Sequence, residues 1–302
     1  MSEQSKHHNA PQAAIFGEVL VDHFPGGQQV LGGAPFNVAW HLQAFGQSPC
    51  FISRVGNDAI GENIRQAMTG WGMSVENLQT DPAYPTGTVK VTINNDEPSY
   101  EILAEQAYDY IAVRQPILAN PFSLIYHGTL ALRDRISEQT LNGLIKHYKG
   151  NVFLDVNLRA PWWSQESVDR WLGKANWVKL NHDELMQLVS SENTLQDAMY
   201  LFLALHNLDV LIVTCGSAGA MALNKDGEFF EVTPTSNLPL VDTVGAGDAF
   251  SAVMLLGILH DWPLSVAMDR AQSFASALVS QRGATVPDLC FYQTFIRAWN
   301  LV

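Results

Sequence analysis

The chain has 302 residues, of which 47% are hydrophobic and 16% charged, so it can bury a large core and is not expected to be disordered. A formal net charge of −13 argues against nucleic acid as a partner, because an acidic surface repels phosphate backbones. The sequence also has no run of about 18 apolar residues that would predict a membrane span, and its polar first twelve residues lack the apolar stretch of a secretory signal.

The N-terminal part predicts two strands and two helices. The apolar run 13–20 predicts a buried strand, and Pro25-Gly26-Gly27 then predicts a turn. A helix is expected over 35–45, with Pro35 in its first turn, where proline fits well. A strand over 49–55 and a helix over 60–71 complete this part of the chain.

The segment 86–103 interrupts this alternation of strands and helices. Val89, Val91 and Ile93 alternate with polar residues up to a turn at 94–96, which predicts a β-hairpin with one polar face. We expect a small β lid formed by about residues 22–32 and 86–112. Closure of such a lid would exclude water from a site beneath it.

The remaining chain returns to a strand–helix rhythm. Strands are expected over 122–127, 151–156, 177–180 and 210–215, and helices over 137–148, 164–172, 182–190 and 195–206. This order predicts one α/β domain over residues 1–302, with a central, mainly parallel sheet covered by helices on both faces. Because ligands of such sheets bind at the carboxyl ends of the strands, polar residues there are candidates: Asp22, Asn157, Arg159, Asn181 and Gly216.

The most informative string is Asp242-Thr243-Val244-Gly245-Ala246-Gly247-Asp248-Ala249-Phe250. The small residues Gly245, Ala246 and Gly247 precede an apolar helix, so their backbone N–H groups can converge on an anionic phosphoryl group. Asp248, in the first turn, could accept the proton of an attacking hydroxyl. The alternative is a flexible glycine turn in which Asp248 caps the helix.

This string resembles the C-terminal signature of the ribokinase-like (PfkB) carbohydrate kinases. The resemblance implies an ATP-dependent enzyme with Asp248 as catalytic base and an anion hole at Gly245, Ala246 and Gly247. Val253 departs from the Gly or Ala that is usual in the family. The strings of P-loop NTPases and protein kinases do not occur.

A second match supports the first. Residues 32–39, read as Gly-Gly-Ala-Pro-Phe-Asn-Val-Ala, together with 54–58 and Gly61, resemble the family's other signature. The resemblance places Gly32, Gly33 and Asn37 in the sugar pocket, and Asp22 matches the family's sugar-binding Asp. From the residues alone, Asp22 reads as a turn residue.

Weaker matches follow in the family's order. Asn181 and Glu184, after Lys179, resemble the Asn-x-x-Glu associated with ATP and with Mg²⁺, which Glu184 would hold through water. The same two residues also have the form of a helix capping box. The remaining ATP-binding candidates by resemblance are Thr214, Gly216, Gly219 and Ala284. Asp242, with main-chain carbonyls, could hold potassium.

The string Asp155-Val156-Asn157-Leu158-Arg159 resembles one that is typical of fructokinase-like members, with Val156 in place of Pro. Asn157 is assigned to the sugar, and Arg159 is placed to reach the transferring phosphoryl group or an acidic substrate, since its planar guanidinium suits either. Fructose is therefore the first choice of substrate, ahead of a 2-keto-3-deoxy sugar acid and then a nucleoside. A sugar acid would require a second cation near the sugar, for which the candidates are Arg54, Lys90 and Arg114.

Several expectations concern partners and surroundings. The isolated cysteines at 50, 215 and 290 suit a reducing cytoplasm, and relatives of this kind suggest a homodimer that pairs through the lid. A non-catalytic sugar-binding protein is the alternative from another class. Trp162-Trp163 could pack over a ligand or anchor a surface loop in the core.

Overall fold

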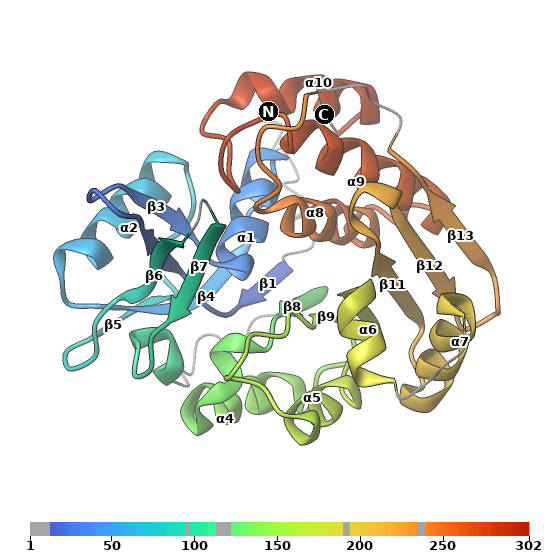
Figure 1. The fold of residues 1–302 in the computed structure, drawn as a ribbon, viewed down its shortest axis with the longest axis horizontal. Coiled ribbons are helices and arrows are strands. Elements are labelled where there is room, and N and C mark those ends of the chain that lie inside the picture. The colour runs from blue at the N-terminus through green and yellow to red at the C-terminus, as the bar shows by residue number, and fades with distance from the viewer. Residues whose placement is uncertain (1–12, 95–96, 113–121, 190–193, 235–238, 302) are drawn as a thin grey trace, which may run out of the picture.

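The computed structural model describes residues 13–94, 97–112, 122–189, 194–234 and 239–301. Within them a large sheet has the strand order β13-β12-β11-β10-β9-β8-β1-β4-β5 (Figure 1). From β5 to β11 neighbouring strands are parallel, and β12 and β13 extend the sheet as antiparallel strands. The strands are β1 (Ala13–Phe16), β4 (Cys50–Gly56), β5 (Leu78–Asp81), β8 (Leu124–His127), β9 (Asn151–Asp155), β10 (Trp177–Asn181), β11 (Val210–Thr214), β12 (Ala220–Asn224) and β13 (Phe229–Val232).

Helices cover both faces of this sheet, as the sequence predicts. One face packs against α1 (Ala34–Ala44), α2 (Ala59–Gly70), α8 (Ala246–Leu259), α9 (Leu264–Leu278) and α10 (Leu289–Trp299). The other packs against α4 (Arg135–Ile145), α5 (Gln165–Leu172), α6 (His182–Leu188) and α7 (Leu195–His206). Short 3₁₀ turns lie at η1 (Ala107–Tyr110), η2 (Leu130–Arg133) and η3 (Gly216–Ala218).

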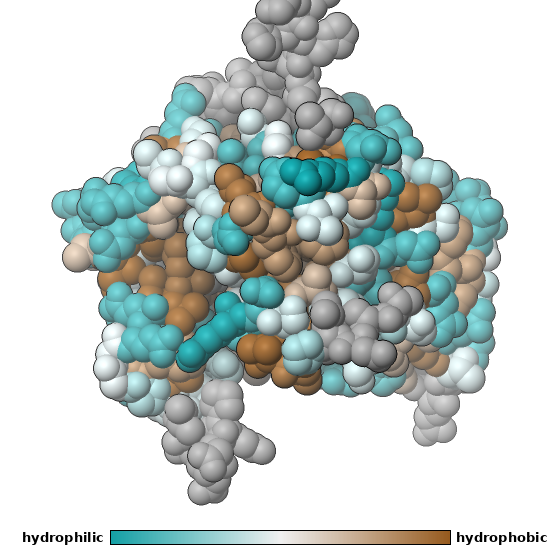
Figure 2. Space-filling model, turned by 90° about the horizontal axis from the view of Figure 1, so that it is seen from above, coloured by the Kyte–Doolittle hydropathy of each residue, from teal (hydrophilic) through white to brown (hydrophobic). Residues whose placement is uncertain are grey.

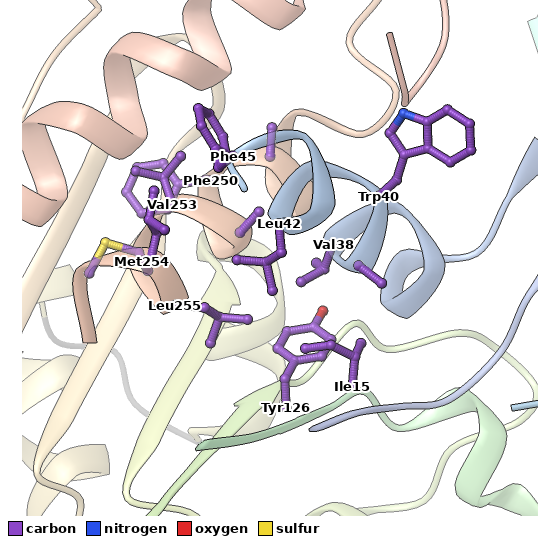
Figure 3. Packing of buried hydrophobic residues seen from close by; sticks show 14 of the residues in the cluster. Ile15, Val38, Trp40, Leu42, Phe45, Tyr126, Phe250, Val253, Met254 and Leu255 are labelled. Carbon is purple, nitrogen blue, oxygen red and sulfur yellow. The ribbon is translucent and has the colours of Figure 1, made fainter. Parts of the chain in front are cut away.

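The two cores follow from the alternation of side chains along each strand. In β1, Ala13 and Ile15 belong to the core beneath α1 and α8, whereas Ala14 and Phe16 belong to the core on the opposite face. Figure 3 shows Ile15 and Tyr126 beneath Leu42 of α1 and Leu255 of α8. The sheet therefore has a hydrophobic core on each face, and the parallel strands direct their carboxyl ends to one edge.

A second sheet contains four strands in the order β3-β2-β6-β7. They are β2 (Leu20–His23), β3 (Gln29–Gly32), β6 (Gly87–Asn94) and β7 (Glu97–Ile102), and β2 and β6 are parallel while the outer pairs are antiparallel. These strands coincide with the segments expected to form the lid.

The prediction of one strand over 13–20 is wrong. The run divides into β1 and β2, which belong to different sheets, and Gly17, with a φ of 150°, lies in the link between them. Asp22 is therefore a residue within β2 and not a turn residue after a strand. An apolar run reports burial, and burial alone cannot show that the chain passes from one sheet to another.

The other predicted elements agree to within a few residues, and α7 has the bounds expected. The sequence reading did not identify β5, β12, β13, α9 or α10. Hydrophobic residues are interspersed with hydrophilic ones on the face shown in Figure 2. Among the described residues, no helix combines the length and the apolar character that a membrane crossing requires.

Candidate active site

A cleft of about 700 Å³ lies between the carboxyl edge of the large sheet and the small sheet. Most of the predicted site residues line it. They are Asp22, Gly32, Gly33, Asn37, Asn157, Arg159, Lys179, Asn181, Glu184, Thr214, Gly216, Gly245, Gly247, Asp248 and Ala284. Gly219, Asp242 and Ala246 do not line it.

Two helices begin at this cleft with a glycine and without a side-chain cap. The N-cap of α1 is Gly33, with a φ of 106°, and the N-cap of α8 is Gly245, with a φ of 79°. A Cβ on Gly33 would lie 2.7 Å from the Glu18 carbonyl oxygen, and one on Gly245 would lie 2.5 Å from Ala284. Close packing therefore requires glycine at both positions, and the uncapped helix ends are suited to anionic groups.

Hydrogen bonds to the Asp242 carboxylate hold the loop before α8 in place. The Asp242 carboxylate accepts hydrogen bonds from the backbone N–H of Val244 at 3.0 Å and of Gly283 at 2.9 Å. The Ala246 N–H donates to the Thr243 carbonyl at 3.3 Å. Within the described chain, the amides of Gly245, Gly247 and Asp248 have no such acceptor and are the ones left for an anion.

The core also supports this loop, through a buried histidine. His41 in α1 lies 3.0 Å from the Ala284 carbonyl through Nε2 and 2.9 Å from the Tyr292 hydroxyl through Nδ1. Burial lowers the pKa of His41 to about 3, so the ring is neutral. Because a carbonyl can only accept, Nε2 carries the proton and Nδ1 accepts from Tyr292. Ala284, which contacts Gly245, is thereby fixed from behind.

Asp248 reaches the cleft from the first turn of α8. Its Oδ2 accepts a hydrogen bond of 2.7 Å from Nδ2 of Asn37, which is 211 residues away in the chain. Burial raises the pKa of Asp248 to about 6, although the Asn37 hydrogen bond and the charges of Lys179 and Arg159 oppose the rise. A carboxylate with this pKa is ionised at neutral pH and is a better proton acceptor than an exposed aspartate.

An ion pair that the sequence reading did not assign lies beneath this loop. Lys179 of β10 and Asp155 of β9 are register neighbours, and Nζ lies 3.0 and 2.9 Å from the two carboxylate oxygens. Ser251 of α8 donates to Asp155 at 2.7 Å, and both charged side chains are buried. In the sequence, Asp155 lies at the end of a predicted buried strand, and this position is the feature that could have identified it as a candidate site residue.

The small sheet supplies a different wall. Asp22 projects into the cleft from β2, and burial raises its pKa to about 6. Around it the wall is aliphatic, with one aromatic residue, Tyr100, that is half exposed. The aliphatic lining residues are Leu20, Val30, Leu31, Val89 and Ile102 of the small sheet and Leu130 of η2, and we call this set the aliphatic wall.

On the opposite side of the cleft lie the expected nucleotide residues. Asn181 and Glu184 form the capping box of α6: the Asn181 side chain accepts from the Glu184 N–H, and Glu184 accepts from the Asn181 N–H. Glu184 also accepts from the Leu158 N–H at 2.8 Å. Gly219 is needed for packing, since a Cβ there would lie 2.0 Å from the Val232 carbonyl oxygen.

Asp58 and Gly61, which belong to the N-terminal family signature, lie away from the cleft and anchor the small sheet. Asp58, the N-cap of α2, accepts from the Gly61 N–H at 2.8 Å, from the Thr86 N–H at 2.8 Å and from the Thr86 hydroxyl at 2.7 Å. Thr86 immediately precedes β6, so Asp58 fixes the point where this strand leaves the body of the molecule.

The tryptophan pair does not line the cleft. The Trp162 indole donates to the Ile102 carbonyl at the end of β7 at 3.2 Å, and Arg133 stacks on its ring at 4.3 Å. The two candidate second cations that the structure describes, Arg54 and Lys90, do not line the cleft either. Arg54 pairs with Asp81 at 2.7 Å, Lys90 is exposed and does not line the cleft, and Arg114 lies outside the described residues.

Comparison with known proteins gives consistent matches over nearly the whole chain. The sequence model of one family, described as pfkB family carbohydrate kinase, matches residues 7–289. An aminoimidazole riboside kinase of Salmonella typhimurium is 30% identical over 89% of each chain. A fructokinase of Klebsiella pneumoniae is 29% identical over 93% of this chain and 90% of its own.

A solved structure agrees with these matches. A double mutant of the fructokinase of Vibrio cholerae O395, crystallised with fructose, ADP and potassium ion, superimposes with a TM-score of 0.78. The two chains are 25% identical, and the match covers 94% of this chain and 98% of the other.

Proposed function

The chain belongs to the pfkB family of carbohydrate kinases, and we propose that within this family it transfers the γ-phosphoryl group of ATP to a primary hydroxyl of fructose. The observation that carries this proposal is the position of Asp248. It is a partly buried carboxylate at the cleft, next to the three backbone amides that have no acceptor in the described chain. A base and an anion-binding loop in one place are what transfer of a phosphoryl group to a hydroxyl requires.

The reaction follows from these positions. Asp22, Gly33 and Asn37 hold the sugar beside Asp248, which accepts the proton of the hydroxyl as the oxygen attacks the γ-phosphorus. The amides of Gly245 and Gly247 and the Arg159 guanidinium stabilise the negative charge on the transferring group. Thr214 and Gly216, which also line the cleft, bind the nucleotide.

Mg²⁺ supplies charge neutralisation to such a transfer, and the residues present fit it through water. Both Glu184 oxygens already accept backbone hydrogen bonds, so the carboxylate is better suited to a water of a hydrated ion than to direct ligation. Asn181 lies beside it. Asp242 is the candidate for a monovalent cation, with a carboxylate that joins two loops of the site.

A riboside is the second candidate acceptor, because the aliphatic wall favours a ligand with an apolar or aromatic group. The aminoimidazole riboside kinase of Salmonella typhimurium shows that a relative acts on such a compound. A sugar acid has less support, since the described cleft residues offer Arg159 and the already paired Lys179 as cations.

Three further features belong to this proposal. The small sheet acts as the lid over the sugar, two copies pair through it, and the enzyme works in the cytoplasm. The free cysteines are compatible with a reducing compartment. A monomer found by light scattering at micromolar concentrations would contradict the pairing.

The test is ADP release from ATP and Mg²⁺ with fructose, ribose, tagatose, 2-keto-3-deoxygluconate, adenosine and aminoimidazole riboside, each with and without potassium. Turnover with fructose far above the others supports the proposal. A preference for the riboside would replace the acceptor and keep the reaction. An absence of turnover combined with ATP binding would favour a non-catalytic protein.

A further inference from the structure

Glu18 is a buried carboxyl in the cleft to which the mechanism above gives no part. It lies in the link between β1 and β2, and its backbone is held tightly, because the Glu18 carbonyl packs against Gly33 and its neighbour Gly17 packs against Pro35. The side chain lines the cleft together with Asp22, Asn37 and Asp248. The rigid link therefore holds this carboxyl at the place expected for the acceptor.

One oxygen of this carboxyl has no partner among the described residues. Glu18 is 3% exposed, and its Oε2 is buried without a hydrogen bond. The Oδ1 of Asn37 is a second buried acceptor without a donor in the same cleft. A buried polar atom without a partner destabilises the protein, so native structures rarely retain one without a reason. Two such acceptors in one ligand cleft are explained by a ligand that supplies donors.

We propose that Glu18 binds the acceptor directly, through a hydrogen bond between its Oε2 and a hydroxyl next to the one that Asp248 deprotonates. The inference rests on the proposed transfer to a polyhydroxylated acceptor. It adds a second carboxyl, besides Asp22, that selects for hydroxyls, and it places that carboxyl beside the reacting group.

The electrostatic surroundings agree with this geometry. Burial raises the pKa of Glu18 to about 7, and the nearby Asp248 adds to the rise. Near neutral pH the carboxyl can therefore accept or donate a hydrogen bond, and a hydroxyl can match either form. The groups that face Glu18 are Asp248 of α8, Arg159 after β9, Arg133 of η2, Tyr126 of β8 and Tyr108 of η1.

The test compares Glu18→Ala and Glu18→Gln with the wild type, using fructose as the probe. Glu18→Ala should raise the KM for fructose about tenfold, the size expected for losing a hydrogen bond to a carboxylate, and leave the KM for ATP unchanged. Monodeoxy fructoses identify the contact. The analogue that lacks the contacted hydroxyl should have the same KM with the wild type and with Glu18→Ala.

Glu18→Gln gives an independent readout, because it keeps the size of the side chain and removes its charge. Because a charged acceptor forms the stronger hydrogen bond, the wild-type KM for fructose should change as Glu18 ionises near pH 7, whereas the KM of Glu18→Gln should stay constant through that range. Glu101→Gln on β7, which removes one exposed charge from the small sheet, is the matched control and should leave the KM and its pH dependence unchanged.

If Glu18 has only a structural role, the result is different. Both Glu18 variants would then keep the wild-type KM and pH profile, and the inference would be overturned. If the wild type does not phosphorylate fructose, the choice of acceptor fails separately. The same comparison then uses ribose or aminoimidazole riboside, whichever the wild type phosphorylates, and isothermal titration with that compound measures its binding without turnover.

Discussion

The floor and the wall of the cleft are built in opposite ways. The floor, at the start of α8 and the ends of β9 and β10, is polar, and its carboxylates are paired with Asn37, Lys179 or Ser251 at 2.7–3.0 Å. The wall, most of which belongs to the small sheet, consists of the aliphatic wall together with Asp22 and Tyr100. The reaction depends on charges that must not move, whereas the choice of acceptor depends on a surface that can vary.

The largest effect should come from the floor. Asp248→Asn keeps the shape of the side chain and removes the base, so kcat should fall by about 10²–10⁴-fold while sugar binding stays nearly intact. Steady-state kinetics and isothermal titration with the sugar measure the two quantities. Normal turnover in this variant would refute the assignment of the base.

The next effect concerns the ion pair that supports the floor. Lys179→Met leaves Asp155 charged and buried, with Ser251 and Tyr126 as its remaining side-chain donors among the described residues, and should lower the free energy of unfolding by about 3–5 kcal/mol in urea titrations. The double variant Lys179→Met, Asp155→Leu should recover much of this loss. Equal losses in the single and double variants would show that the pair contributes little.

The pH dependence distinguishes the floor from the wall. Because the pKa of Asp248 is raised to about 6, kcat/KM should fall about tenfold per pH unit below that value as the base becomes protonated. Asp22, whose pKa is also raised to about 6, is the control. Asp22→Asn should raise the KM for the sugar but keep the acidic limb. If Asp22→Asn loses the acidic limb of kcat/KM, the group that titrates is Asp22 on the wall and not Asp248.

The smallest effect is expected from the wall. Tyr100→Ala should raise the KM for the acceptor by roughly threefold to tenfold, because half of this side chain is exposed and its contact area is limited. Stability should change by less than about 0.5 kcal/mol. Tyr100→Phe should behave as the wild type if the ring is what matters. A change in kcat alone would break the division between floor and wall.

Local patterns in the sequence predict the fold class and part of the candidate site. The alternation of short apolar strands with helices gives the covered, mainly parallel sheet, and the string around Asp248 gives the family and the anion loop. These features are local, because strand period, helix period and the glycines before a helix are properties of neighbouring residues.

The tertiary structure decides which residues from distant segments come into contact. It joins Asn37 to Asp248, divides the run 13–20 between two sheets, places Asp155 and Lys179 under the anion loop, and leaves one Glu18 oxygen in the cleft without a partner among the described residues. It also gives Gly219 and Trp162 structural contacts outside the cleft. Burial and hydrogen-bond pairing depend on which residues meet after folding, and no local pattern encodes that.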